Sequence, residues 1–244
     1  MLKNEIISRR LEEMKQHSDP SVSLWPENCA GSRRALVIFV GPSPGGKKDG
    51  IRIGIKSESN QPLWNKPYND PLTWSRGFRH SFKPIVEEIF NGIPYEEASK
   101  LIARVNMDWA SNPESYDVSL LYMWEGCKSI LPVIYECDPE LVIPMDEKTF
   151  GVLQIALYND GYKITPPQIR KIKVEISNNK KTRYHTSIMA FTAKRNDRSF
   201  LVMKSLQHPA RIFDVEYARR IGQAIRESAI QVWNEKIVDI DIVG

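Results

Sequence analysis

A chain of 244 residues can form one large domain or two small ones. Its composition, 41% hydrophobic and 26% charged, supplies enough apolar material for a large core and excludes global disorder. No stretch approaches the roughly 18 apolar residues that a membrane span requires. The first residues are charged and lack the apolar run of a signal peptide, so we expect a cytoplasmic protein that does not engage a membrane.

The net charge of +4 is unevenly distributed along the chain. Ten Lys and Arg residues lie between Thr165 and Lys204, and only Glu175 and Asp197 oppose them, so this stretch carries +8 and the remainder −4. A positive field of this size suits the phosphate backbone of a nucleic acid. Charge alone is equally consistent with the solvated face of a β-hairpin.

The cysteines are Cys29, Cys127 and Cys137, with no Cys-x-x-Cys pair. Three such residues assemble neither a disulfide framework nor a four-cysteine metal site. We therefore expect buried structural thiols, no metal and no cofactor.

Hydrophobic spacing predicts the first elements in chain order. Apolar residues recur near helical spacing over 4–17 and predict an N-terminal helix. Residues 18–32 have the composition of a turn-rich linker. The continuous apolar run at 35–40 predicts a buried parallel strand, and the Gly, Pro, Asn and Trp residues of 50–73 predict an irregular excursion.

Helical and strand patterns alternate along the rest of the chain. Helices are predicted at 75–91, 95–102, 118–137 (interrupted near Pro132), 147–158 and 215–236. Strands are predicted at 103–107, 140–144 and 200–205, with β structure over 168–192 and a hairpin turn at Asn178 and Asn179.

This alternation predicts an α/β fold, a three-layer αβα arrangement with a central mostly parallel sheet covered on both faces. We expect a single domain over 1–244, with a core of about 33–235 and a basic β-rich insertion at about 165–200. Ligands of such sheets bind outside the carboxyl ends of the strands. The polar loops after strands are therefore the places where a functional site is expected.

The loop after the first predicted strand reads Gly-Pro-Ser-Pro-Gly-Gly-Lys-Lys over residues 41–48. Its glycines allow the backbone to approach a ligand closely, and Lys47 and Lys48 together with free N–H groups could hold an anion. The spacing is not that of a Walker loop. On its own, this loop predicts no more than a turn.

Two further predicted strand ends carry polar residues. Asn106 and Asp108 are two positions apart and would share a face if the strand extends that far. An amide can hydrogen-bond a base edge and a carboxylate can activate water, but an Asx cap explains the pair equally well. His208, held by Pro209 after the strand at 200–205, is positioned to donate a hydrogen bond to a leaving base, although a lone histidine is more often structural.

The order of these parts resembles the uracil-DNA glycosylase superfamily. The chain has a strand, a Gly-Pro-x-Pro-Gly loop, an aromatic-rich excursion, a strand ending in Asn106, Asp-Pro-Glu-Leu-Val-Ile-Pro at 138–144, and a strand followed by His-Pro. The match runs over residues 35–225, and the order of four short motifs is more specific than any one of them. The cysteine count excludes the iron–sulfur branch, which needs four ligands.

The resemblance implies a uracil-DNA glycosylase-like αβα fold and a monofunctional DNA glycosylase. Such an enzyme hydrolyses the N-glycosidic bond of a flipped-out base and leaves an abasic site. Asn106 would bind the Watson–Crick edge of the base, and His208 would stabilise the departing base by about 3 kcal/mol, as one oxyanion-hole donor does. One aromatic residue would stack on the base, the candidates being Trp64, Tyr68 and Phe78.

The resemblance also places residues against DNA, the expected partner. Arg211 would bind a phosphate, and Ile212 or Phe213 would enter the minor groove as an apolar wedge. Lys47 and Lys48 would contact phosphate. We expect the protein to act as a monomer.

Two residues depart from the family pattern. Ser43 stands where many members have Asp or Asn to handle the attacking water, and serine is a poor proton acceptor near neutral pH. Asp108 is the candidate substitute; weaker candidates are Asp49, Asp70 and Asp146. Gly45 stands where the most uracil-selective branch has a tyrosine, so the site would accept a bulkier, C5-substituted or otherwise modified pyrimidine.

Two other classes of function stay open. A non-catalytic nucleic-acid-binding relative of the same fold is favoured by Ser43 and disfavoured by the retained Asn106 and His208. A nucleotide-binding or phosphate-handling enzyme could use the Gly/Pro loop, but the sequence has no metal-ligand or Walker context for it. A β-elimination lyase is disfavoured because no lysine lies within a motif that could form a Schiff base.

Overall fold

The computed structural model describes residues 8, 29–31, 34–42, 76–107, 118–175, 183–204, 212 and 214–239. Of the N-terminal helix predicted at 4–17, only Ser8 lies among them, and it is helical. The excursion predicted at 50–73 and the hairpin turn predicted at Asn178 and Asn179 lie outside them.

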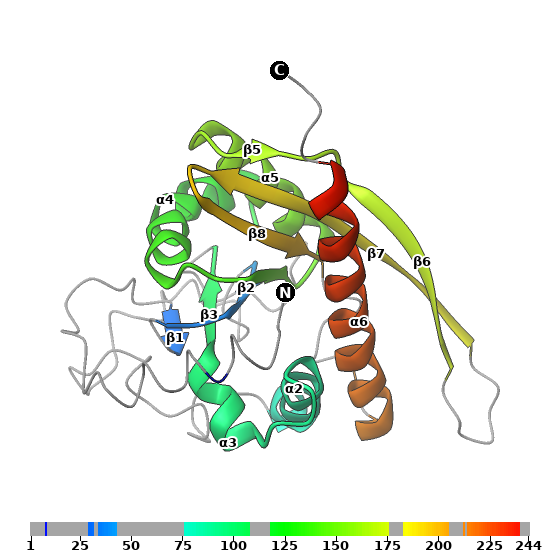
Figure 1. Cartoon of the computed structure of the whole chain (residues 1–244). Coiled ribbons are helices and arrows are strands. Elements are labelled where there is room, and N and C mark those ends of the chain that lie inside the picture. Colours follow the sequence, from blue (N-terminus) through cyan, green and yellow to red (C-terminus); the bar gives the residue numbers. More distant parts are fainter. Residues whose placement is uncertain are drawn as a thin grey trace, which may run out of the picture.

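A sheet that has eight strands within the described residues forms the centre of the molecule (Figure 1). Its four middle strands are parallel, in the spatial order β3 (Ile102–Asn106), β2 (Val37–Gly41), β4 (Leu141–Pro144) and β8 (Arg198–Met203). The chain passes from β2 to β3 on one side and later returns to β4 on the other. The two connections therefore diverge at β2, which makes its carboxyl end a topological switch point.

Antiparallel strands extend this parallel centre at both ends. At one edge β1 (Cys29–Gly31) pairs with β3. At the other, β7 (Arg183–Arg195) pairs with β8, with the short β5 (Lys163–Ile164) and with β6 (Gln168–Glu175). The sheet is therefore that of a general α/β fold, parallel at its centre and antiparallel at both edges.

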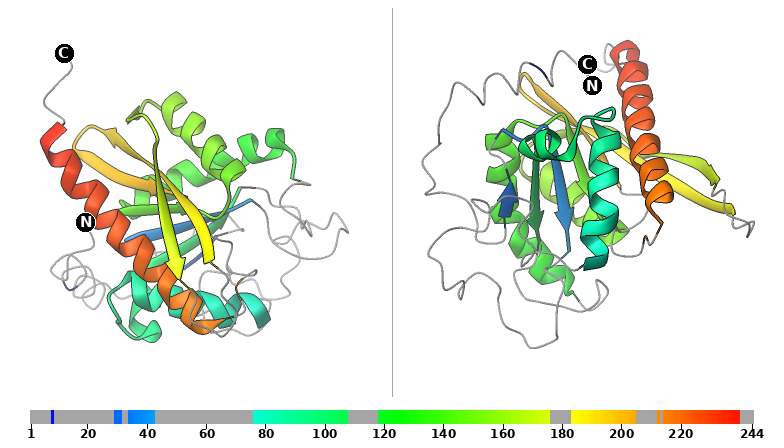
Figure 2. Two further views of the ribbon diagram at one scale, coloured as in Figure 1. Left: turned by 90° about the vertical axis from the view of Figure 1, so that its right-hand side faces the viewer. Right: turned by 90° about the horizontal axis from the view of Figure 1, so that it is seen from below.

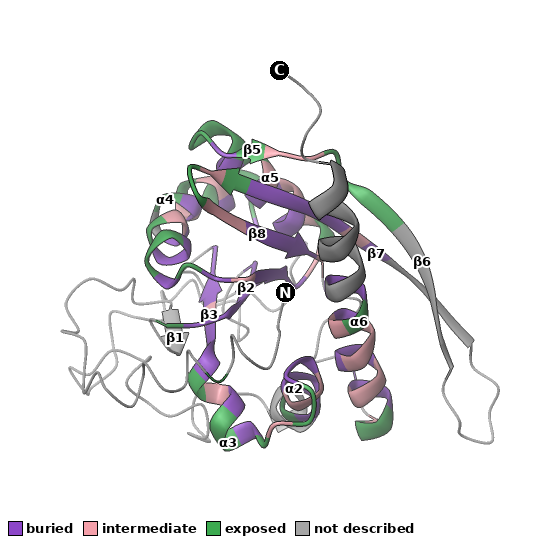
Figure 3. Ribbon diagram, in the orientation of Figure 1, coloured by how far each residue is buried: buried purple, intermediate pink, exposed green. Residues whose placement is uncertain are grey.

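Helices cover both faces of the sheet, as the buried sides of the helices show in Figure 3. On one face lie α2 (Arg76–Ile89), α3 (Tyr95–Ala98) with the 3-10 turn Ser99–Leu101, and α6 (Val215–Asp239). On the other lie α4 (Leu120–Cys137) and α5 (Glu147–Asn159). The three-layer αβα arrangement expected from the alternation of strands and helices is present in these residues.

The strand β2 shows why the sequence predicts this layering. Val37 and Phe39 pack against the layer that contains α2 and α6, whereas Ile38 and Val40 pack against the layer that contains α4 and α5. All four side chains are at most 3% exposed. A strand covered on both faces needs apolar residues at every position, which is the pattern of a parallel sheet buried between helices.

Most predicted elements are confirmed to within three residues, but three differ. Cys29–Gly31 is a strand rather than part of a linker. Three residues are too few to show the alternation of apolar and polar residues that predicts a strand, and these three form β structure through pairing with β3. The helix predicted at 95–102 ends earlier, as α3 at Ala98 and the 3-10 turn at Leu101. The Leu101 carbonyl already accepts a hydrogen bond from the Leu36 N–H (2.8 Å), next to the start of β2. The helix α4 continues through the exposed Pro132, where water can satisfy the carbonyl that loses its helical donor.

The basic β-rich insertion expected at 165–200 is narrower than the sequence indicates. Phe191 and Ala193 of β7 are fully buried, and β7 and β8 are strands of the main sheet. Within the described residues of this stretch, the far ends of β6 and β7 leave the body side by side (Figures 1 and 2).

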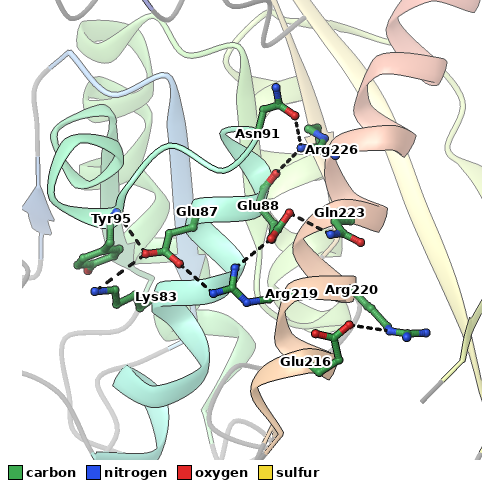
Figure 4. Close-up of polar contacts among 10 residues, drawn as sticks. All are labelled: Lys83, Glu87, Glu88, Asn91, Tyr95, Glu216, Arg219, Arg220, Gln223 and Arg226. Atoms are coloured by element: carbon green, nitrogen blue, oxygen red, sulfur yellow. Dashed lines mark hydrogen bonds and ion pairs between the residues drawn. The ribbon is translucent and has the colours of Figure 1, made fainter. Parts of the chain in front are cut away.

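Polar side chains join α2 and α6 along their contact (Figure 4). The carboxylate of Glu88 accepts hydrogen bonds from Arg219 (3.1 Å) and Gln223 (3.0 Å). Arg226 donates to the Glu88 carbonyl (3.1 Å) and to the side chain of Asn91 (2.7 Å). The three hydrogen bonds to Glu88 are partly buried, so they replace bonds that these groups would otherwise make to water.

Gly222 permits the close approach of α6 to α2. A Cβ at this position would lie 2.6 Å from the Ile85 carbonyl oxygen and 2.7 Å from the Glu88 Cβ. We predict that Gly222→Ala lowers the free energy of unfolding by about 1–3 kcal/mol, the cost of overpacking. Gly151→Ala in α5 is the matched control, because nothing lies within 4 Å of its Cβ position. Urea denaturation should show Gly151→Ala to be stabilising by up to about 1 kcal/mol, and equal effects at both sites would contradict the prediction.

Tyr95 gives the fold a defined sensitivity to alkaline pH. Burial, and then the negative charges of Glu96 and Glu87, raise the pKa of Tyr95 well above its ordinary value of 10.0. The phenol of Tyr95 ionises near pH 10 in the unfolded chain but stays neutral in the folded one. Its contribution to the free energy of unfolding is therefore complete below pH 10 and is lost as the pH rises further. We predict that stability falls less steeply above pH 10 in Tyr95→Phe than in the native chain, measured by urea denaturation at each pH. If the free energy of unfolding falls equally steeply above pH 10 in both proteins, the prediction is wrong.

Candidate functional site

The carboxyl ends of β2, β3 and β4 meet at the switch point of the sheet. Gly41 at the end of β2 stands opposite Asn106 in register, and the Met107 N–H donates to the Gly41 carbonyl (2.9 Å). On the other side, the Met145 N–H donates to the Val40 carbonyl (2.8 Å). The hydrogen-bond ladders on both sides of β2 thus fix the relative positions of three strand ends.

Asn106 is a polar side chain enclosed at this edge, only 6% exposed. Its Oδ1 lies 2.5 Å from the position that a Cβ on Gly41 would take, and the Met145 sulfur lies 3.8 Å from that position. Gly41 is therefore a glycine because the amide of Asn106 occupies the space of a side chain. The contact lies on the α2 side of the sheet, where alternation also places Phe39.

The helix α2 begins at the same end of the molecule. In the right-hand view of Figure 2, the arrowheads of β2 and β3 point to the end at which α2 and α6 start. A helix between parallel strands runs back along the sheet, so its first turn lies at the carboxyl edge. The backbone of Phe78, one of the three predicted stacking residues, is in this first turn; its side chain lies outside the described residues.

Asp146 places a carboxylate directly after β4. One oxygen, Oδ1, accepts a hydrogen bond from the Thr149 N–H (2.7 Å) and caps the start of α5. The other oxygen, Oδ2, is buried, and no donor in the described part of the chain contacts it. Capping thus uses only half of the hydrogen-bonding capacity of this side chain.

The start of α4 lies beside the start of α5 at this carboxyl edge. The Lys148 ammonium of α5 donates to the Val118 carbonyl (2.6 Å), which holds the beginnings of the two helices together. A Cβ on Gly126 would overlap the Met107 carbonyl, so α4 lies directly against the end of β3. The first three residues of α4 are large, apolar and more than half exposed, namely Leu120, Leu121 and Tyr122.

Ile212 was predicted as one of two candidate DNA wedges, and the structure gives it a different setting. Its side chain is 1% exposed and packs in the core with Met203 and the residues of α2 and α6. A side chain buried in this way cannot enter a groove unless the core opens. The other candidate, Phe213, lies outside the described residues, and its role as a wedge stays a prediction.

The structure brings together few of the site residues predicted from the sequence. Gly41 and Asn106 lie at the carboxyl edge of the sheet. The first turn of α2, which contains the backbone of Phe78, begins at the same end of the molecule. The remaining predicted residues lie outside the described parts of the chain: Ser43, Gly45, Lys47, Lys48, Asp49, Trp64, Tyr68, Asp70, Asp108, His208, Arg211 and Phe213. Their roles stay predictions.

Two features of the edge received little or no weight in the sequence. Asp146 ranked among the weaker acidic candidates, although an Asp after a strand and before a helix is a recognisable N-cap at the carboxyl edge. The exposed Leu120, Leu121 and Tyr122 could not be told from core residues, because hydrophobicity alone does not distinguish the outer face of a helix from its inner face.

Other groups in the described residues have no catalytic setting. Cys127 and Cys137 are buried, as predicted, and burial raises the pKa of Cys127 to about 12, which keeps it an unreactive thiol. Within these residues no group of three or more His, Cys, Asp or Glu side chains could hold a metal ion. None of the helices described is both long and apolar enough to cross a membrane.

The fold and this edge define an α/β protein with a buried amide and a carboxylate at the switch point of its sheet. Comparison with models of protein families finds no match, and comparison with curated proteins finds no significantly similar sequence.

The contact between Gly41 and Asn106 can be tested by a double-mutant cycle. We predict that Gly41→Ala costs about 1–3 kcal/mol in the native chain, because the added Cβ forces the Asn106 amide to move. In an Asn106→Ala background the clashing atoms are gone, and the same change should cost much less. The coupling energy from urea denaturation measures the contact. A coupling near zero would mean that Asn106 does not occupy this space.

Proposed function

We propose that this protein is a DNA glycosylase that hydrolyses the N-glycosidic bond of a flipped-out modified base and leaves an abasic site. The observation that carries the proposal is the enclosed amide of Asn106 beside Gly41 at the switch point. An amide offers both a donor and an acceptor, which suits the Watson–Crick edge of a base. The motif order that resembles the uracil-DNA glycosylase superfamily supports the same conclusion.

The reaction requires a proton acceptor near the attacked carbon. Water adds its oxygen to C1′ of the deoxyribose, the C1′–N bond breaks, and its electron pair remains on the base. The water proton passes to a carboxylate, and His208 stabilises the negative charge of the departing base. Asp108 is the acceptor expected from the sequence, and the buried Oδ2 of Asp146 makes it the second candidate.

The substrate class follows from the first loop. Gly45 has no side chain to bar substituents at C5 of a pyrimidine, so we propose a modified pyrimidine bulkier than uracil. Ser43 supplies no base for the water, which is why the carboxylate must come from elsewhere.

A non-catalytic DNA-binding protein is the second candidate function. The serine at position 43 favours it, since a chain that has lost its water-activating group would still bind a flipped base. In that case DNA carrying the modified base would bind without any base being released.

The proposal is tested by incubating the protein with duplexes that carry uracil, thymine or C5-substituted pyrimidines, followed by alkaline cleavage at abasic sites. We expect release of a bulky pyrimidine. Asp108→Asn should lower the rate by about 10²–10⁴ if Asp108 is the proton acceptor, and His208→Ala by about 10²–10³. If no base of the panel is released, the chain is not a glycosylase for these substrates and the second candidate gains.

Asp146→Asn separates the two candidate carboxylates, because asparagine caps a helix about as well as aspartate does. The fold should be retained while the proton acceptor is lost. Asp160→Asn is the matched control: this exposed carboxylate follows α5 at its far end and pairs with Arg195 (2.8 Å). A rate lowered in Asp146→Asn but kept in both Asp108→Asn and Asp160→Asn would assign the role to Asp146 and overturn the assignment to Asp108.

A further inference from the structure

The ends of β6 and β7 form a two-stranded ribbon that leaves the sheet. The ladder between β7 and β8 ends where Ala190 pairs with Met203, followed by a bond from the Lys204 N–H to the Met189 carbonyl (2.8 Å). Among the described residues, 183–187 of β7 pair only with 171–175 of β6. We call these ten residues, 171–175 and 183–187, the ribbon.

The ribbon extends from the carboxyl side of the sheet. Because β7 runs antiparallel to β8, the residues that precede Ala190 continue past the carboxyl end of β8. Five pairs at about 3.4 Å each give the ribbon a length of about 17 Å. Figures 1 and 2 show both strands leaving the body beside α6.

The register divides the ribbon into two unlike faces. In an antiparallel pair, residues directly opposite each other share a face. Lys171, Lys173 and Glu175 stand opposite Ser187, His185 and Arg183, so one face bears three positive charges and one negative. The other face bears Ile172 and Val174, opposite Thr186 and Tyr184.

We propose that the ribbon binds double-stranded DNA, with its cationic face against the phosphates on one side of the nucleotide taken into the site. A two-stranded β-ribbon fits the major groove, and Lys and Arg side chains supply most phosphate contacts. The partner is a polyanion because the ribbon lies in the stretch from Thr165 to Lys204 that carries +8.

The position of the ribbon fits contact with flanking nucleotides. The strand β7 is three strands away from β2, which is about 14 Å at the usual strand spacing. Successive strands are rotated by about 20–25°, so the ribbon leaves at an angle to β2. One duplex lying over the carboxyl edge would reach both elements a few nucleotides apart. The inference rests on the proposed function only in placing a target nucleotide at that edge.

Binding to an unmodified DNA duplex, measured by fluorescence anisotropy between about 50 and 200 mM salt, tests the ribbon without requiring any base release. We expect Lys171→Gln with Lys173→Gln to lower the slope of log K against log salt by about 1.8, since each phosphate contact contributes about 0.9. The conservative pair Lys171→Arg with Lys173→Arg should retain the slope and shows that the ribbon tolerates change.

The matched control removes two lysines from the opposite end of β7. Lys163 and Lys194 are exposed cross-strand partners of β5 and β7 on the amino side of β8. Lys163→Gln with Lys194→Gln changes the net charge equally and should leave the slope unchanged. Equal losses in both double variants would show a general charge effect and overturn the proposal, as would an unchanged slope in the ribbon variant.

Two further outcomes separate this proposal from the others. If double-stranded RNA shows the loss and DNA does not, the ribbon is an RNA-binding element and the proposal is wrong. If the ribbon variant loses DNA affinity while the native chain releases no base, the ribbon proposal holds and the glycosylase proposal fails.

Discussion

The parallel pairing of β2 between β3 and β4 is the constraint on which the candidate site depends. Its ladders place Gly41 opposite Asn106 and hold Met145 beside them. Because the enclosed amide of Asn106 takes the space of a side chain, position 41 must be glycine. The backbone pairing of the sheet thereby determines which polar group is presented at the switch point.

The helices pack against the strands that form this edge and against each other. The helix α4 lies against the end of β3 at Gly126, and Lys148 joins the beginnings of α4 and α5. On the other face, Gly222 and the hydrogen bonds of Glu88 fix α6 against α2. Since each of these contacts joins segments far apart in the sequence, the edge is assembled only when the whole α/β core is folded.

Much of the fold was predictable from local patterns, whereas little of the site was. The apolar run at 35–40 and the helical spacing at 75–91 identified β2 and α2 because burial and periodicity leave a direct trace in sequence. The strand Cys29–Gly31 has no such pattern in the sequence, since its β structure depends on pairing with β3. The place of Asn106 at a strand end was predicted, whereas the sequence did not show that one oxygen of Asp146 caps α5, or that Ile212, one of two candidate wedges, lies in the core.

Local patterns in the sequence predict the α/β class, the order of the elements and the concentration of positive charge after Thr165. These are properties of short windows, and periodicity and composition express them without reference to distant residues. The folded arrangement was needed to show that β7 belongs to the main sheet, that its end forms a ribbon with β6, and that Asn106 contacts Gly41. The physical reason is that strand register and close packing are settled between segments, through hydrogen bonds and volumes that no single segment contains.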